Sequence, residues 1–127
     1  MKLEHVALNI PDVHAQSLWF VENFGLKIVM EGDTAPYFHF LSDGQGAMLE
    51  FYSNTAVNMP DYANVHPSNV HIAFSSDNIE ADRDRLIAAG ATLFSDVAST
   101  ARGDKLVFLR NPWQLPFQFV QRSQPLE

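Results

Sequence analysis

Apolar and polar residues alternate along two short stretches of the chain that lie far apart. LEHVALNI (3–10) and NVHIAFSS (69–76) both show the two-residue period of a half-buried strand. Each stretch is followed by a segment with helical features and then by further strand-like runs. The pattern therefore predicts that one arrangement of elements occurs twice.

The predicted helices carry recognisable end signals. The first runs through Phe24 and ends at Gly25, a residue suited to the left-handed position after a helix. The second is predicted to begin with Asp77 as N-cap and Glu80 three residues later, a capping-box pattern, and to stop at Gly90. Trp19, Phe20 and Phe24 are expected to form the buried face of the first helix.

Three strand candidates follow each helix, so each half reads β-α-β-β-β and the fold class is α+β. We divide the chain into module one (1–53), a polar linker with two prolines (54–68) and module two (69–122). The candidates are 26–31, 36–41 and 47–53, then 91–97, 105–110 and 115–122.

A nearly constant offset between the halves indicates an internal duplication. His5 and His71 differ by 66 positions, Gly25 and Gly90 by 65, and Glu50 and Gln118 by 68. The small drift is expected to fall in turns, where insertions are tolerated.

Composition narrows the classes of protein to consider. The 127 residues, 46% hydrophobic and 12% aromatic, suit a single compact domain. No run reaches the roughly 18 apolar residues of a membrane span, and no signal-peptide pattern is present, so we expect a cytoplasmic protein that does not bind membranes. A net charge of −7 without a basic run argues against nucleic acid. With no Cys, any metal must use His, carboxylate or amide ligands.

Strand parity brings four polar residues to one face. In LPFQFV (115–120), Gln118 lies opposite the bulky side chains of Phe117 and Phe119, and in AMLEFYS Glu50 is likewise opposite its apolar neighbours. His5 and His71 have the same parity in the opening strands. Burying such groups without partners costs about 1–3 kcal/mol for each neutral group.

A divalent cation would satisfy all four groups, so the predicted metal ligands are His5, Glu50, His71 and Gln118. Two imidazoles, a carboxylate and an amide would accept Ni, Zn, Co, Mn or Fe(II) and leave room for water or substrate. His14, His39 and His66 lack partners at equivalent positions and are left out of this site.

These residues give the sequence a resemblance to the vicinal oxygen chelate superfamily, which includes glyoxalase I, bleomycin-resistance proteins and extradiol dioxygenases. The resemblance is carried by LEHVALNIPD, FVENFGLKIV, AMLEFY, NVHIAF and FLRNPWQLPFQFVQ, nearly the whole chain. It implies paired βαβββ modules that form a cup-shaped mixed sheet with helices on its outer face. It also implies a homodimer.

The last motif departs from the commoner family pattern. NPWQLPFQ stands in place of D-P-x-G-N-x-x-E, so Gln118 replaces a Glu that many members use as ligand and base. The resemblance implies that Glu50, at the equivalent position of the first module, takes over the role of catalytic base.

The resemblance leaves three functions open. The first is a metal-dependent lyase or isomerase of the glyoxalase type, acting on a small carbonyl or carboxylate substrate through an enediolate. The second is a metal-free protein that binds a small molecule, as in the bleomycin-resistance branch. The third, an extradiol-type dioxygenase, is disfavoured because the final Glu is missing. We prefer the first, because the chain keeps three ligand residues and replaces the fourth conservatively.

Overall fold

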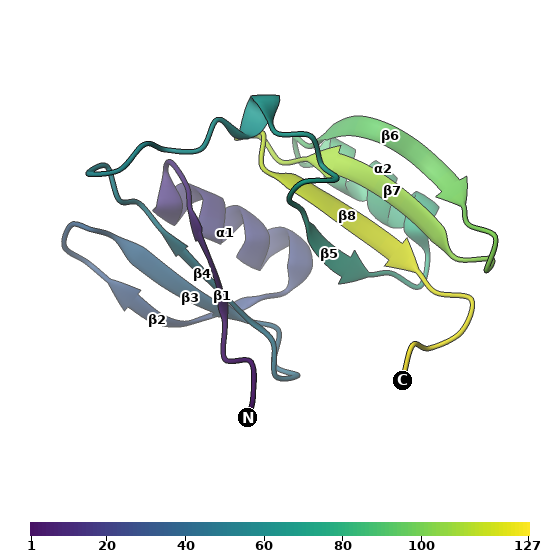
Figure 1. Ribbon diagram of the computed structural model, residues 1–127, viewed down its shortest axis with the longest axis horizontal. Helices are drawn as coiled ribbons and strands as arrows, with labels where there is room; N and C mark the ends of the chain where they lie inside the picture. The colour runs from purple at the N-terminus through teal and green to yellow at the C-terminus, as the bar shows by residue number, and fades with distance from the viewer. The chain divides into compact units, whose positions relative to one another are not determined.

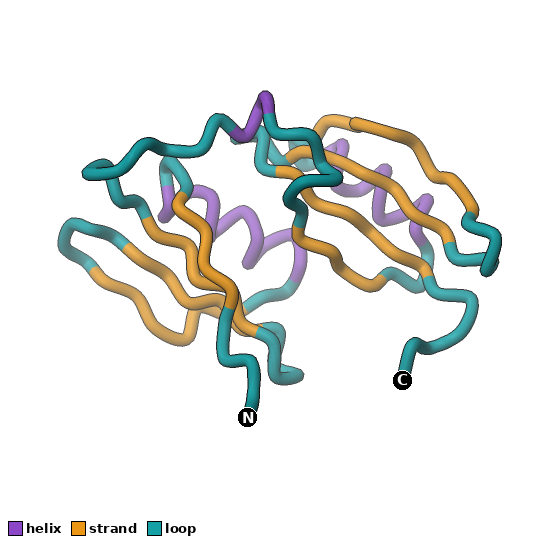
Figure 2. Tube along the Cα trace, viewed as in Figure 1, coloured by secondary structure: helices purple, strands orange, loops and turns teal.

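The computed structural model describes residues 1–127 and divides them into two compact units, Met1–Pro60 and Asp61–Glu127. Each unit contains one strand, one helix and three further strands in that order. These elements are labelled in Figure 1, and Figure 2 colours them by type. The predicted α+β fold of two βαβββ modules is confirmed. No helix is both long and apolar enough to cross a membrane.

The first unit consists of a four-stranded sheet with one helix against one of its faces. The strand order is β1-β4-β3-β2, with β1 parallel to β4 and the other neighbours antiparallel. The elements are β1 (Val6–Asn9), α1 (Val13–Phe24), β2 (Lys27–Gly32), β3 (Phe38–Ser42) and β4 (Met48–Tyr52).

Aromatic side chains fix α1 on this sheet. Phe20 is fully buried, stacks on Phe24 with ring centroids 5.2 Å apart, and meets the buried Phe51 of β4 at 5.2 Å. Trp19 is 8% exposed and packs edge-on against Phe20. The helix ends as predicted at Gly25, whose φ of 68° is the left-handed conformation that glycine adopts without a steric cost.

The second unit repeats this layout with the strand order β5-β8-β7-β6. Its helix α2 packs against β6, β7 and β8. The elements are a 3₁₀ turn η1 (Tyr62–Asn64), β5 (Ile72–Ser75), α2 (Ile79–Ala88), β6 (Thr92–Ser99), β7 (Lys105–Arg110) and β8 (Pro116–Gln121).

The predicted linker is divided between the two units. Arg110 of β7 donates hydrogen bonds to the carbonyl oxygens of Tyr62 (2.6 Å) and Val65 (2.8 Å). These bonds hold the later part of the segment, including η1, to the second unit.

One predicted helix start is wrong. The N-cap of α2 is Asn78, not Asp77, and its side-chain oxygen accepts from the amide of Ala81 at 3.2 Å. The hydroxyl of Ser76 accepts from the Asn78 amide and donates to the Asp82 carboxylate. The turn before the helix is therefore one residue longer than predicted. Asn is as effective an N-cap residue as Asp.

The repeat extends to the register of the strands. In the first sheet Glu50 pairs with Ala7 on one side and Phe40 on the other; in the second, Gln118 pairs with Ala73 and Phe108. Both sheets also have a β-bulge near the start of the strand that follows the helix, between Ile28 and Met30 and between Leu93 and Ser95. The two halves therefore share this irregularity as well as their order of elements, and β6 has a second register shift between Ser95 and Ala98 that β2 lacks.

Candidate functional site

His5 and Glu50 lie together in the first unit. His5 directly precedes β1, and its Nε2 atom is 3.2 Å from the Glu50 carboxylate. The ring meets Phe40 edge-on with centroids 5.1 Å apart, and Phe40 is the cross-strand partner of Glu50. These two residues, which strand parity places on one face, are therefore close to each other within one sheet.

The other ring nitrogen of His5 is also engaged. Its Nδ1 atom lies 2.6 Å from a carboxylate oxygen of Glu4. When Nδ1–H donates to this carboxylate, a neutral ring has its lone pair on Nε2, where a cation between Nε2 and Glu50 would bind it. A carboxylate that orients a histidine in this way is a common outer partner of a metal ligand.

His71 and Gln118 hold the equivalent places in the second unit. The His71 ring meets Phe108 edge-on with centroids 5.1 Å apart, and Phe108 is the cross-strand partner of Gln118. The Nδ1 atom of His71 lies 2.6 Å from the carbonyl oxygen of Pro67, so its proton is held there and Nε2 again keeps the lone pair. The Gln118 side chain is buried, with 7% of the residue exposed.

The donors of both pairs fit a divalent cation. Two ligand atoms at about 2.0–2.2 Å from one ion lie roughly 3 Å apart when they are neighbours in its coordination shell. The separation of 3.2 Å between His5 and Glu50 agrees with that geometry. In each unit one imidazole, already held through Nδ1, shares a sheet face with an oxygen donor. The assignment of all four residues as metal ligands remains a prediction.

A second cluster, which the sequence reasoning left out, lies in the first unit. The Nε2 atom of His39 is 3.1 Å from Nδ1 of His14 and 3.2 Å from the Glu31 carboxylate. One ligand atom from each residue lies within 4.8 Å of the others. His14 and His39 have no counterparts in the other half of the chain, as the sequence indicates, but they contact each other in a cluster that the sequence did not predict. His66, in the second unit, accepts from the Ser68 amide and packs against Phe94.

His39 is buried within this cluster, with 3% of the residue exposed. Burial lowers the pKa of its imidazole below the ordinary value, the Glu31 carboxylate raises it in part, and His14 lowers it further. The ring is therefore kept in its neutral form, in which one nitrogen carries a lone pair.

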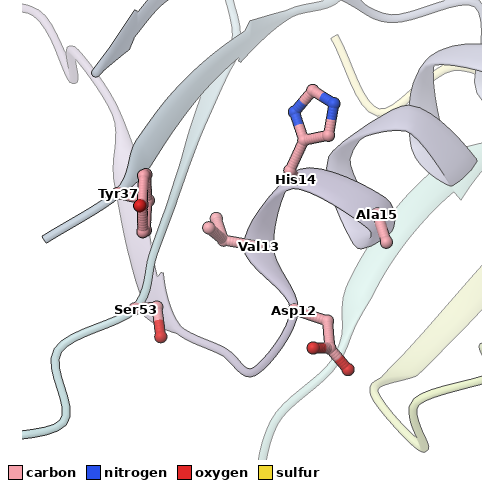
Figure 3. Close-up of a pocket in the computed structure, with 6 residues that line it drawn as sticks. All are labelled: Asp12, Val13, His14, Ala15, Tyr37 and Ser53. Atoms are coloured by element: carbon pink, nitrogen blue, oxygen red, sulfur yellow. The ribbon is translucent and has the colours of Figure 1, made fainter. Parts of the chain in front are cut away.

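A cavity of about 460 Å³ borders this cluster at the start of α1. It is lined by Asp12, Val13, His14, Ala15, Tyr37 and Ser53, shown in Figure 3. His14 belongs to both features, because it lines the cavity while its Nδ1 atom contacts His39.

The chain has the architecture of a class of proteins built from two βαβββ modules. In each module a histidine precedes the first strand and an oxygen donor lies on the last strand. A family model matches residues 2–119 and is described as the Glyoxalase/Bleomycin resistance protein/Dioxygenase superfamily. The chain belongs to this superfamily.

Solved structures show the same fold. A glyoxalase family protein from Bacillus cereus is 13% identical with a TM-score of 0.79, and the match covers 95% of this chain and 93% of that one. The protein SMU.1112c is 26% identical with a TM-score of 0.73, covering 94% and 98%. Glyoxalase I from Zea mays is 18% identical with a TM-score of 0.76; the match covers 97% of this chain but only 45% of the maize enzyme. No curated protein sequence gives a significant match.

Proposed function

We propose that the protein is a metal-dependent lyase or isomerase of the glyoxalase type that acts on a small carbonyl or carboxylate compound. The observation that carries the proposal is the pair formed by His5 and Glu50, whose Nε2 and carboxylate oxygen are 3.2 Å apart. The superfamily and the fold shared with maize glyoxalase I agree with this chemistry.

In this proposal His5, Glu50, His71 and Gln118 hold a divalent ion of the Ni, Zn, Co, Mn or Fe(II) group. Both histidines are already oriented through Nδ1, by Glu4 in one unit and by the Pro67 carbonyl in the other. This fixed orientation lowers the entropic cost of using each Nε2 as a ligand. When bound, the ion supplies Lewis-acid stabilisation of negative charge on substrate oxygens.

Glu50 is proposed as the general base. It removes a proton from the hydroxyl-bearing carbon next to the substrate carbonyl, which leaves an enediolate, and it returns that proton to the former carbonyl carbon. The hydroxyl proton passes to the other enediolate oxygen, which completes an isomerisation. Its side chain is 22% exposed, so the carboxylate is accessible while only partly solvated. General-base catalysis by such a group contributes about 10²–10⁴ in rate.

The experiment is a proton-exchange assay that does not require the natural substrate to be known. The purified protein is incubated in D₂O with small α-oxo and α-hydroxy carbonyl compounds and their thiol adducts, and loss of the C–H signal is followed by NMR. We expect metal-dependent exchange in the wild type and none after His5→Ala with His71→Ala. Exchange that persists in the double variant would overturn the metal-dependent mechanism. Tight binding without a metal and without exchange would instead favour the metal-free binding protein.

A further inference from the structure

The cluster of His14, Glu31 and His39 lies on the opposite face of the first sheet from Glu50. His39 and Phe40 are consecutive on β3, so their side chains point to opposite faces. Phe40 faces Glu50, whereas His39 pairs with the buried Phe51 of β4, on the side that α1 covers. The cluster is thus separate from the site proposed above.

We propose that His14, Glu31 and His39 form a second metal site for a divalent ion such as Zn²⁺ or Co²⁺. Three elements supply the ligands: His14 in the first turn of α1, Glu31 on β2 and His39 on β3. Glu31 and His39 are direct cross-strand partners, so the sheet itself sets their spacing. Two imidazoles with one carboxylate favour zinc and neighbouring transition metals over Mg²⁺ or Ca²⁺, which prefer oxygen ligands.

The distances fit the ligands of one ion, and hydrogen bonds alone do not satisfy all three groups. His39 Nε2 lies 3.1 Å from His14 Nδ1 and 3.2 Å from the Glu31 carboxylate, close to the spacing of adjacent ligands around one ion. If Nε2 of neutral His39 carries the proton, two acceptors share that single proton. If His14 donates to Nε2 instead, the lone pair of Nε2 is used and the carboxylate has no proton to accept. A cation attracts the lone pairs of all three groups together.

The buried His39 ring has no other polar partner. Its Nδ1 atom is buried without a hydrogen bond, so the only polar contacts of the ring are made at Nε2, inside the cluster. Nδ1 also lacks the acceptor that normally supports a metal-bound imidazole. We therefore expect binding about 10–100-fold weaker than at a site with that support.

The site is accessible from solvent through its other two ligands. The Glu31 side chain is 55% exposed, and His14 is an exposed residue that borders the 460 Å³ cavity. Figure 3 shows Tyr37 and Ser53 across from Val13 in this cavity. With three protein ligands, an ion here retains at least one position for water or a small ligand.

The test titrates metal-free protein with Co²⁺, whose visible d–d absorption reports nitrogen and oxygen ligands. His5→Ala with His71→Ala removes the site of the proposed function, so any remaining Co²⁺ reports the second site. We expect about one Co²⁺ per chain in this background. Adding His14→Gln or Glu31→Gln should weaken it more than about tenfold. Both residues are exposed, so these changes spare the core, and circular dichroism verifies the fold.

The matched controls are His66→Gln, an exposed histidine of the second unit, and Glu22→Gln, an exposed glutamate on α1. Both should leave the Co²⁺ affinity unchanged. No Co²⁺ bound in the His5→Ala, His71→Ala background, or equal affinity with and without His14→Gln and Glu31→Gln, would overturn the second site. A second experiment tests the same site without the double alanine variant. His14→Gln with Glu31→Gln in the otherwise wild-type chain should lose only the Co²⁺ ion that the second site holds. Failure of the proposed function changes the exchange assay but not this result.

Discussion

Glu50 and Gln118 occupy the same position in two copies of one structural unit. Each is paired with an alanine on the parallel neighbouring strand and with a phenylalanine on the antiparallel one, and each phenylalanine meets a histidine ring edge-on at 5.1 Å. The duplication has thus kept the packing around the two positions while one residue is a carboxylate and the other an amide. The difference in charge between them is the feature with the clearest chemical consequences.

Replacing the Gln118 amide by a carboxylate should tighten metal binding. Gln118→Glu is nearly isosteric and adds one negative charge to the ligand set, so we expect roughly tenfold higher affinity. Gln118→Leu should weaken binding about 10–100-fold and spare the fold, because a buried strand position tolerates Leu. Calorimetric titration of Co²⁺ or Zn²⁺ into the three proteins, each carrying His14→Gln and Glu31→Gln to remove the second site, measures both effects. Equal affinities would show that Gln118 does not touch the metal.

Glu50→Gln should separate metal binding from proton transfer. The amide keeps an oxygen that can bind the ion but is too weak a base to remove a carbon-bound proton. We expect a loss of about 10²–10⁴ in the rate of C–H exchange, with metal still bound at reduced affinity. Glu22→Gln on the exposed side of α1 serves as the control and should exchange at the wild-type rate. An unchanged rate in Glu50→Gln would assign the base to another residue.

Much of the fold could be predicted because local signals agree with the tertiary structure. The alternating opening stretches, the helix stop at Gly25 and the equivalent positions of His5 and His71 all have direct counterparts in the structure. Strand parity places His5 and Glu50 on one face, and the register adds their contact, because Ala7, two residues after His5, is the cross-strand partner of Glu50.

The second cluster could not be predicted from parity alone. A β-bulge between Ile28 and Met30 shifts the alternation along β2, so the facing of Glu31 does not follow from the start of that strand. His14 reaches the cluster from a helix, which requires the packing of α1 on the sheet. One signal was available: in the β3–β4 hairpin His39 lies opposite Phe51, which is adjacent to Glu50 on β4 and so points to the other face of the sheet.

The protein is expected to form a homodimer in which sheets dock edge to edge. The edge strand β2 exposes Val29 (57%) and Met30 (53%), and an apolar edge with unpaired backbone groups favours association. Sedimentation equilibrium should give a dimer for the wild type, and Val29→Lys should shift it toward monomer. The control is Val57→Lys, an equally exposed valine outside the sheets. A monomeric wild type at working concentration would contradict the prediction.

A glycine at position 114 should stabilise the protein. Gln114 has φ 72°, a left-handed conformation that costs a residue with a side chain about 1–2 kcal/mol. The turn is held by Asn111, whose side chain accepts from the amides of Trp113 and Leu115, so the conformation is imposed by its neighbours. Glycine also increases the entropy of the unfolded chain, which offsets part of the relieved strain. The net gain in the free energy of unfolding from Gln114→Gly is therefore about 0.5–1 kcal/mol.

Urea denaturation measures this gain. Gln45→Gly is the matched control, because Gln45 is an exposed turn residue whose φ is not positive. That variant should be neutral or less stable than the wild type. A loss of stability in Gln114→Gly would show that the side chain of Gln114 contributes more than the backbone strain costs.

Asp104 should make stability depend on pH in the acid range. Its carboxylate is buried and accepts a hydrogen bond from the Ser123 amide at 2.8 Å and another from Arg122 at 2.9 Å. The Ser123 amide, followed by Arg122, holds the pKa of this carboxyl below its ordinary value. The unfolded chain therefore takes up the proton first as the pH falls. The stabilisation is fully present above about pH 4 and is lost as the pH falls through the lowered pKa of the folded state.

Asp104→Asn should lower the urea midpoint at pH 7, and the difference between its midpoint and that of the wild type should become smaller below pH 4. Asp33→Asn, at an exposed position, should show neither effect. A wild-type advantage that is equally large at pH 7 and pH 3 would show that the charge of Asp104 is not what stabilises the second unit.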